Sequence, residues 1–187
     1  ILTAAEKLFN RFGIRKTGMD EIARLSRVAR GTLYNYFGSK EGILDELVKS
    51  KLSMFEDILG KKLAGLRDPV EKLRAVIRER IRVTLNSPFL SASTLTPEAP
   101  EDGVLKGIYM ELDRRSGIFL EKIIDALYAG KLPVTQKESL LRTLLCTLRG
   151  IESTLTETPE PPKNDQIEAD IDTMVGMVLS RQIPSGR

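Results

Sequence analysis

The chain of 187 residues contains no histidine, no tryptophan and one cysteine, Cys146. A single thiol excludes a disulfide within the chain, and without histidine a Cys/His zinc site has almost no ligands. A histidine base, a glycine-rich phosphate loop and a cluster of metal ligands are also missing, which argues against an enzyme. We therefore expect a protein without catalytic activity, cofactor or metal, and the unpaired thiol fits a reducing cytoplasm.

Long apolar runs are missing as well. No run approaches the roughly 20 residues that a membrane-spanning helix needs, and no secretory signal is visible. The sequence thus predicts a cytoplasmic protein without membrane association. A chain of this length can form one domain or two small ones with a real core. The first residue is Ile1 rather than methionine, which leaves open a preceding native segment.

Charge is distributed unevenly along the chain. Residues 1–52 hold ten Lys/Arg and six Asp/Glu, a net of +4, whereas residues 53–187 hold nineteen and twenty, a net of −1. A basic segment can release counterions from DNA, although charge alone is equally typical of a solvated surface. The decision between these interpretations depends on whether the basic segment also carries a DNA-binding motif.

A helix-turn-helix pattern lies within this basic segment. An apolar-periodic stretch over residues 19–26 is followed, after about three residues, by a second short helix over residues 30–37, RGTLYNYF. Leu33 and Phe37 are four residues apart and form the face that packs inward. The other side combines a cation, two phenols, an amide and a hydroxyl, which suits the edges and phosphates of a DNA major groove.

Spaced residues over the first quarter of the chain resemble the TetR family of transcriptional repressors. They are Ala4-Ala5-x-x-Leu8-Phe9-x-x-x-Gly13, the segment from Thr17 to Ala23, and Gly31-Thr32-Leu33-Tyr34-x-Tyr36-Phe37-x-Ser39-Lys40-Glu41. Beyond about Leu47 the resemblance reaches only helix number and order. It implies a homodimer that binds double-stranded DNA at a palindromic operator and is released by a small-molecule effector.

Two positions depart from the family's pattern. Arg27 stands where the family usually has glycine in the turn, so we expect strain from a non-glycine residue at positive φ. Ala29 stands where serine or threonine often caps the recognition helix, and alanine offers no oxygen to the free N–H groups. A less ordered turn, or a cap supplied from elsewhere, would follow.

The helix signals predict an all-α, TetR-like fold of about nine helices. We expect a three-helix DNA-binding domain over residues 1–45 and an effector-binding and dimerisation bundle over residues 46–187. Gly13 ends the first helix, and Thr17 caps the second, with Gly18 as the alternative cap. Further start signals are Ser39, Asp68-Pro69 and Asn164, and a short helix is expected near residues 90–95.

The resemblance and the residue chemistry together nominate a DNA-binding set. Arg30 is predicted to bind a guanine, Lys40 a phosphate, and the Thr17 region another phosphate. Short Thr32 and Asn35 suit base contacts, and the two tyrosines are expected to divide between a base and phosphates. The full set is Thr17, Arg27, Arg30, Gly31, Thr32, Tyr34, Asn35, Tyr36 and Lys40.

The C-terminal half offers candidates for effector binding and dimerisation. Leucines of the penultimate helix spread over more than one face, which favours a dimer over a deep monomeric core. Effector candidates are Phe89, Leu90, Tyr109, Met110, Arg115, Phe119, Cys146 and Arg149. The apolar members also fit ordinary core, and the arginines fit either an anionic effector or a salt bridge. A DNA-bound protein that recruits a partner through its bundle, without an effector, is the alternative function.

Overall fold

The computed structural model describes residues 1–87, 102–157 and 163–180. Those residues form eight helices and no strand, which confirms the all-α prediction. The helices are α1 (Leu2–Lys16), α2 (Met19–Ser26), α3 (Arg30–Phe37), α4 (Lys40–Ala64), α5 (Pro69–Leu85), α6 (Asp102–Leu127), α7 (Val134–Glu157) and α8 (Asn164–Leu179). The short helix expected near residues 90–95 lies outside the described residues, so the described count is eight rather than about nine.

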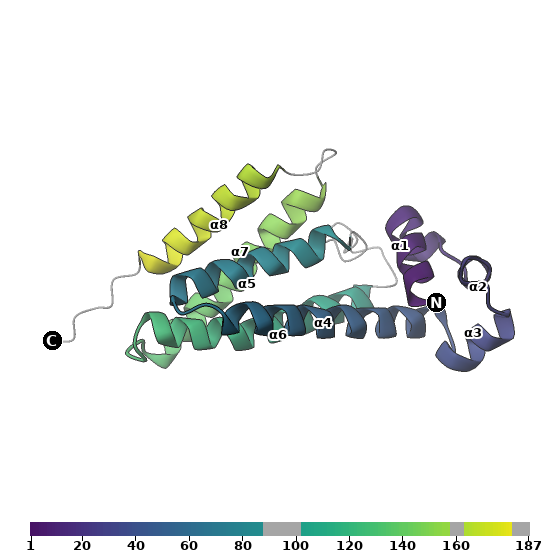
Figure 1. The fold of residues 1–187 in the computed structure, drawn as a ribbon, viewed down its shortest axis with the longest axis horizontal. Coiled ribbons are helices and arrows are strands. Elements are labelled where there is room, and N and C mark those ends of the chain that lie inside the picture. The colour runs from purple at the N-terminus through teal and green to yellow at the C-terminus, as the bar shows by residue number, and fades with distance from the viewer. Residues whose placement is uncertain (88–101, 158–162, 181–187) are drawn as a thin grey trace.

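The three short helices α1–α3 form a head at one end of the molecule (Figure 1). Helix α4, with 25 residues, runs from this head along the bundle of α5–α8. At 1.5 Å per residue its length is about 37 Å. One helix therefore belongs structurally to both parts and can transmit a displacement between them.

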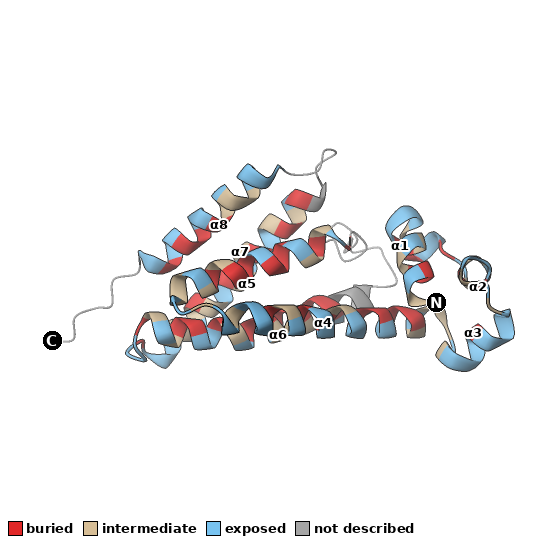
Figure 2. Cartoon of the chain, in the orientation of Figure 1, coloured by how far each residue is buried: buried red, intermediate tan, exposed pale blue. Residues whose placement is uncertain are grey.

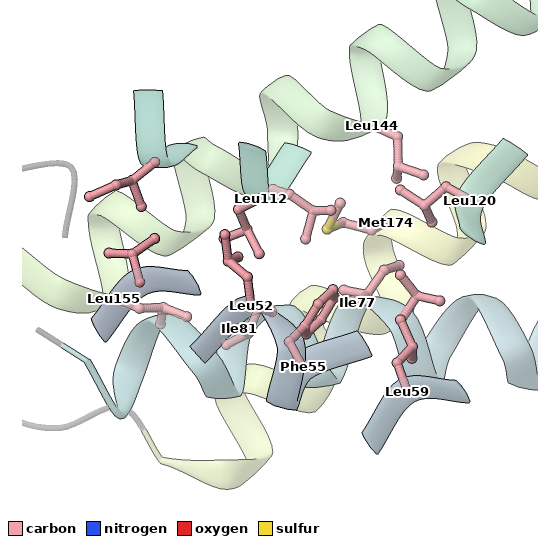
Figure 3. Close-up of a cluster of buried hydrophobic side chains, with 14 of the residues drawn as sticks. Leu52, Phe55, Leu59, Ile77, Ile81, Leu112, Leu120, Leu144, Leu155 and Met174 are labelled. Carbon is pink, nitrogen blue, oxygen red and sulfur yellow. The ribbon is translucent and has the colours of Figure 1, made fainter. Parts of the chain in front are cut away.

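A continuous apolar core holds the helices together. Helix α5 lies in the middle of the bundle and contacts α4, α6, α7 and α8. Figure 3 shows Phe55 and Leu59 of α4 gathered with Ile77 of α5 and with apolar side chains of α6, α7 and α8. Each fully buried side chain of this size contributes about 1.5–3 kcal/mol. The same cluster continues through α4 into Phe9 and Leu33 of the head, so head and bundle share one core.

Two of the predicted helix starts are confirmed by their side-chain caps. The Ser39 hydroxyl accepts a hydrogen bond from the Gly42 amide at 3.2 Å, and Asp68 accepts from the Val70 amide at 3.0 Å. Both oxygens satisfy N–H groups that the first helical turn leaves free. These caps fix where α4 leaves the head and where α5 begins.

Two other helices are not capped by the residue that the sequence placed first. Helix α2 is capped at Gly18, whose amide donates to the Glu21 carboxylate at 2.9 Å, because the Thr17 hydroxyl instead donates to the Gly13 carbonyl at 2.8 Å. Helix α8 starts at Asn164 itself, with Lys163 in the cap position. Gly18 is the alternative cap that the sequence offered, and Thr17 does not cap α2 because its buried side chain bonds to α1. The cap of α8 lies one residue before the predicted Asn164.

Candidate nucleic-acid interface

The recognition helix α3 is held by its inner face and presents its outer face. Leu33 is completely buried, and Phe37 packs half-buried against the same core. On the opposite side Gly31, Thr32 and Asn35 are exposed, as Figure 2 shows for most of α3. Tyr34 and Tyr36 expose 40% and 78% of their surface, which is costly for aromatic side chains unless a partner covers them.

Helix α3 is anchored to the start of α4 by a close backbone approach. Gly38 makes the turn with a positive φ of 70°, a backbone conformation that residues with a Cβ rarely adopt. Four residues on, a Cβ added at Gly42 would lie 2.1 Å from the Phe37 carbonyl oxygen, so only glycine fits there. The end of the recognition helix is thereby fixed relative to the long helix α4.

The turn before α3 shows the strain that the sequence predicts. Arg27 adopts the left-handed conformation, with φ 57° and ψ 39°. Its amide donates to the Arg24 carbonyl at 3.3 Å, and the Val28 amide donates to the Ala23 carbonyl at 3.1 Å. These bonds satisfy the last carbonyls of α2 and hold the turn in a conformation that glycine would adopt more easily.

The N-terminus of α3 lacks a side-chain cap, also as predicted. Ala29 occupies the cap position in an extended conformation and offers no acceptor to the first amides of the helix. Free amides at a helix N-terminus favour an anion such as a DNA phosphate. The missing cap is consistent with an interface that a phosphate completes.

Arg30, the first residue of α3, contacts a carboxylate that sequence reasoning did not assign to the site. Its Nη1 donates to Oδ2 of Asp20 at 3.0 Å, and its Nε lies 2.9 Å from Oδ1. The guanidinium also lies over the Tyr34 ring, 5.5 Å from the centroid. Tyr34 and then Asp20 raise the pKa of Arg30 above its ordinary value.

Two predicted DNA contacts have structural partners within the head. The Thr17 side chain is only 2% exposed and its hydroxyl is engaged, so it is not presented to a ligand. The Lys40 ammonium donates to the Ile14 carbonyl at 2.9 Å and to the Arg15 carbonyl at 3.4 Å. Lys40 therefore joins the start of α4 to the end of α1. The structure brings together Arg27 and the α3 residues and leaves the Thr17 side chain apart from them.

The bundle contains a buried ionic cluster of Arg80 (α5), Asp113 (α6) and Glu152 (α7). Nε and Nη2 of Arg80 donate to the two Glu152 oxygens at 2.9 and 3.2 Å. Nη2 of Arg80 also lies 2.6 Å from Oδ1 of Asp113, an ion pair that lacks hydrogen-bond geometry. Burial raises the pKa of the Glu152 carboxyl and outweighs the lowering by Arg80, while Asp113 raises it further.

Tyr109 borders this ionic cluster. The side chain is buried, and within the described part of the chain its hydroxyl has no hydrogen-bond partner. Burial, and then the charge of Glu152, raise the pKa of Tyr109. The hydroxyl is therefore neutral and can donate a hydrogen bond to an acceptor. A buried donor without an acceptor is costly, which marks this position as one where a ligand or water could bind.

Apart from Arg149, which reaches Asp113 of this cluster, the other predicted effector residues do not gather around Tyr109. Met110 and Cys146 face outward, Phe119 packs half-buried on the core, and Phe89 and Leu90 lie outside the described residues. Arg115 pairs with Glu111 at 2.7 Å and with Glu56 at 2.8 Å, and Arg149 pairs with Asp113. Both arginines are therefore in the salt bridges that the sequence offered as the alternative to an anionic effector.

Residues 1–47 match the family model of bacterial regulatory proteins of the tetR family. The N-terminal head of the chain is therefore similar to the TetR family. The match covers the head and the start of α4. This part contains helix α3, the strained turn before it and the close backbone approach at Gly42. The rest of the assignment depends on relatives and on the fold.

A curated relative is an HTH-type transcriptional regulator of Mycobacterium tuberculosis, 33% identical over 107 residues. That alignment covers 57% of this chain and 53% of the relative, so the chain spans about half the length of the curated relatives it matches. That relative is named a transcriptional regulator.

Solved structures with the same fold cover nearly the whole chain. The regulator FadR from Bacillus subtilis, in complex with stearoyl-CoA, is 21% identical with a TM-score of 0.74, covering 96% of both chains. A regulator from Saccharomonospora viridis, in complex with choline, is 16% identical with a TM-score of 0.73, covering 96% of this chain and 93% of that one. At these identities the likeness establishes the fold.

None of the described helices combines the length and hydropathy that crossing a bilayer requires.

Proposed function

We propose that this protein is a cytoplasmic, homodimeric repressor that binds a palindromic DNA operator and leaves it when a small molecule binds the bundle. The observation that carries the proposal is α3, which buries Leu33 and presents Arg30, Thr32 and Asn35 on a basic head. These side-chain types suit the donor and acceptor pattern of a major groove. Occupying an operator blocks polymerase without any further activity.

The C-terminal helices support the homodimer. Grooves open on α7 and between α7 and α8, and apolar side chains line much of them. In the first groove Leu141, Leu145 and Cys146 lie beside the charged Glu138, Arg142 and Arg149. In the second groove the exposed Met177 lies beside the buried Leu140, Leu144, Met174 and Val178. Isologous packing of two such surfaces would place two heads on one twofold axis, with recognition helices about 34–36 Å apart.

The ionic cluster beside Tyr109 supports control by an effector. A ligand with a polar acceptor would satisfy the Tyr109 hydroxyl and would bind among α5, α6 and α7. Helix α4 packs against two of these, α5 and α6. The stearoyl-CoA and choline complexes show that relatives of the same fold accept small molecules. We test the site by ligand-induced thermal shifts, in which Tyr109→Phe should reduce the shift that an effector produces in the native protein.

The DNA-binding function is tested by selecting bound duplexes from a random pool while measuring the mass of the complex. We expect a palindrome bound by two chains. Arg30→Ala should reduce binding to this palindrome by about 1–3 kcal/mol and relax the preference at one position of each half-site. Failure to enrich any sequence at low salt would overturn the function, and equal losses on selected and random duplexes would remove Arg30 from base recognition.

A further inference from the structure

Asp20 is an acidic side chain within the proposed DNA-binding surface. It follows the α2 cap by two positions and exposes 61% of its side chain, so it is not buried for the sake of the core. A carboxylate near DNA repels phosphates and cancels part of the positive charge that supplies non-specific affinity. An acidic residue in this positively charged head therefore needs a function that offsets the DNA affinity it costs.

The contact with Arg30 supplies that role. Both Asp20 oxygens face the guanidinium, through Nη1 at 3.0 Å and Nε at 2.9 Å, while Tyr34 lies under its plane. An arginine at the start of an exposed helix would otherwise populate many rotamers and lose that freedom on binding. A carboxylate on one side and a ring below restrict the guanidinium before DNA arrives.

The same contact limits binding to the wrong DNA. An unrestrained arginine can reach a phosphate on any sequence, whereas a guanidinium held by Asp20 must give up an ion pair to do so. Holding the guanidinium in this way favours contact with a base along the direction in which α3 points. It disfavours contacts with phosphates of any sequence. Because the pair is exposed, its effect on folding stability is small. Specificity and folding can thus be separated experimentally.

We propose that Asp20 is a positioning residue that orients Arg30 for one base contact and suppresses its pairing with phosphates elsewhere. The proposal rests on the proposed DNA-binding function and adds a specificity determinant to it. The acidic residue would make the head bind random DNA less tightly, while the ordered arginine keeps affinity for the selected site.

Asp20→Asn tests the proposal because it removes the charge and keeps the shape. Binding to the selected palindrome should weaken by about 2- to 10-fold, the usual cost of ordering one flexible side chain. Binding to random duplex should strengthen at low salt, and its log–log salt slope should steepen by about one per head as Arg30 gains a phosphate. The ratio of specific to random affinity therefore falls, which a purely structural role would not produce.

The matched control is Asp45→Asn on α4. Asp45 is equally exposed, at 62%, and pairs at 2.7 Å with Lys49, so the variant loses the same charge without touching α3. We expect an unchanged specificity ratio. Arg30→Lys, which keeps the charge but loses the planar fork, should reproduce the loss of specificity. In an Arg30→Ala background, Asp20→Asn should no longer change the ratio.

The outcomes separate the two proposals. If the native protein selects no sequence, the DNA-binding function fails and Asp20 loses its role with it. If the native protein selects a palindrome but Asp20→Asn keeps the native ratio and salt slope, the positioning role alone is overturned. An equal change of the ratio in the native and Arg30→Ala backgrounds would also overturn it, because Asp20 would then act without Arg30.

Discussion

Replacing Arg80 by methionine tests the buried ionic cluster of the bundle. The Arg80 side chain is completely buried, and its nitrogens hold Glu152 through two hydrogen bonds and Asp113 through an ion pair. Methionine has a similar length and no charge, so it fills much of the space and leaves two buried carboxylates without their shared cation. Asp113 keeps its contact with Arg149, which is half-exposed.

The structure sets the size of the expected loss. Removing one partner of a buried, hydrogen-bonded ion pair typically lowers the free energy of unfolding by about 3–5 kcal/mol. For a chain of this length the midpoint of thermal unfolding should fall by about 6–20 °C. Arg78→Met is the matched control, since Arg78 lies on the same helix and binds Glu168 through two hydrogen bonds, at 2.7 and 2.6 Å, with both side chains nearly half exposed. Its loss should be about 0–1 kcal/mol.

The loss at Arg80 should also depend on pH. Burial already raises the pKa of Glu152 above its ordinary value of 4.5, and without Arg80 it rises further. A carboxyl whose pKa is higher in the folded state binds its proton there first. The penalty for burying its charge is therefore complete above the folded pKa and disappears as the pH falls toward the unfolded pKa. Arg80→Met should lose less stability at about pH 5 than at about pH 8.

Urea unfolding followed by circular dichroism, at one fixed protein concentration, measures these differences. Adding Glu152→Gln to Arg80→Met should recover part of the stability and flatten the pH dependence, because one uncompensated charge is gone. The reasoning is refuted if Arg80→Met and Arg78→Met lose the same free energy, or if the loss at Arg80 does not shrink at the lower pH.

Three further substitutions, with Gly60→Ala as a control for one of them, test the head and its connection to α4. Arg27→Gly should raise the free energy of unfolding by about 0.5–1 kcal/mol, because glycine adopts the left-handed conformation at this turn without strain; an unchanged or lower value in urea unfolding would contradict this. Gly42→Ala should lower the free energy of unfolding by about 1–3 kcal/mol, because the new Cβ would overlap the Phe37 carbonyl. Gly60→Ala should raise the free energy of unfolding by up to about 1 kcal/mol, because nothing lies within 4 Å of the new Cβ. Equal effects of the two alanines in the same assay would show that the close approach is not rigid. Lys40→Ala should weaken binding to all duplexes alike and flatten the salt slope, and should also destabilise the head by about 1 kcal/mol through loss of the Ile14 contact. A loss confined to the selected sequence, in a salt titration, would contradict the phosphate role.

Much of the head could be predicted from the sequence because its signals are local. Leu33 and Phe37, four residues apart, define the inner face of α3 whatever surrounds them, and the structure buries both to different degrees. The strain at Arg27 and the missing cap at Ala29 likewise follow from residue type and position in the turn. The Ser39 and Asp68 caps depend on a side chain and an amide two or three residues away.

The hydrogen bond of Thr17 could not be predicted from local sequence alone. Its hydroxyl could serve either the helix that follows or the turn that precedes it, and the sequence pattern ranked the first choice higher. Burial of Thr17 against the head fixed its side chain toward the Gly13 carbonyl, so Gly18 became the cap. Tertiary packing decided between two local hydrogen bonds of similar strength.

The sequence by itself determined the helical class, the helix-turn-helix and the side chains on the outer face of α3, because helical periodicity and caps act over three or four residues. Only the tertiary structure decided which charges meet. Asp20 reaches Arg30 across ten positions, and Arg80 reaches Glu152 across 72. Such contacts depend on the angle and offset at which helices pack, and these follow from the fit of whole apolar faces rather than from any short pattern. The amino-acid order therefore specified the exposed surface that we propose to bind DNA, and the packing of the helices set the charge pairs within and behind it.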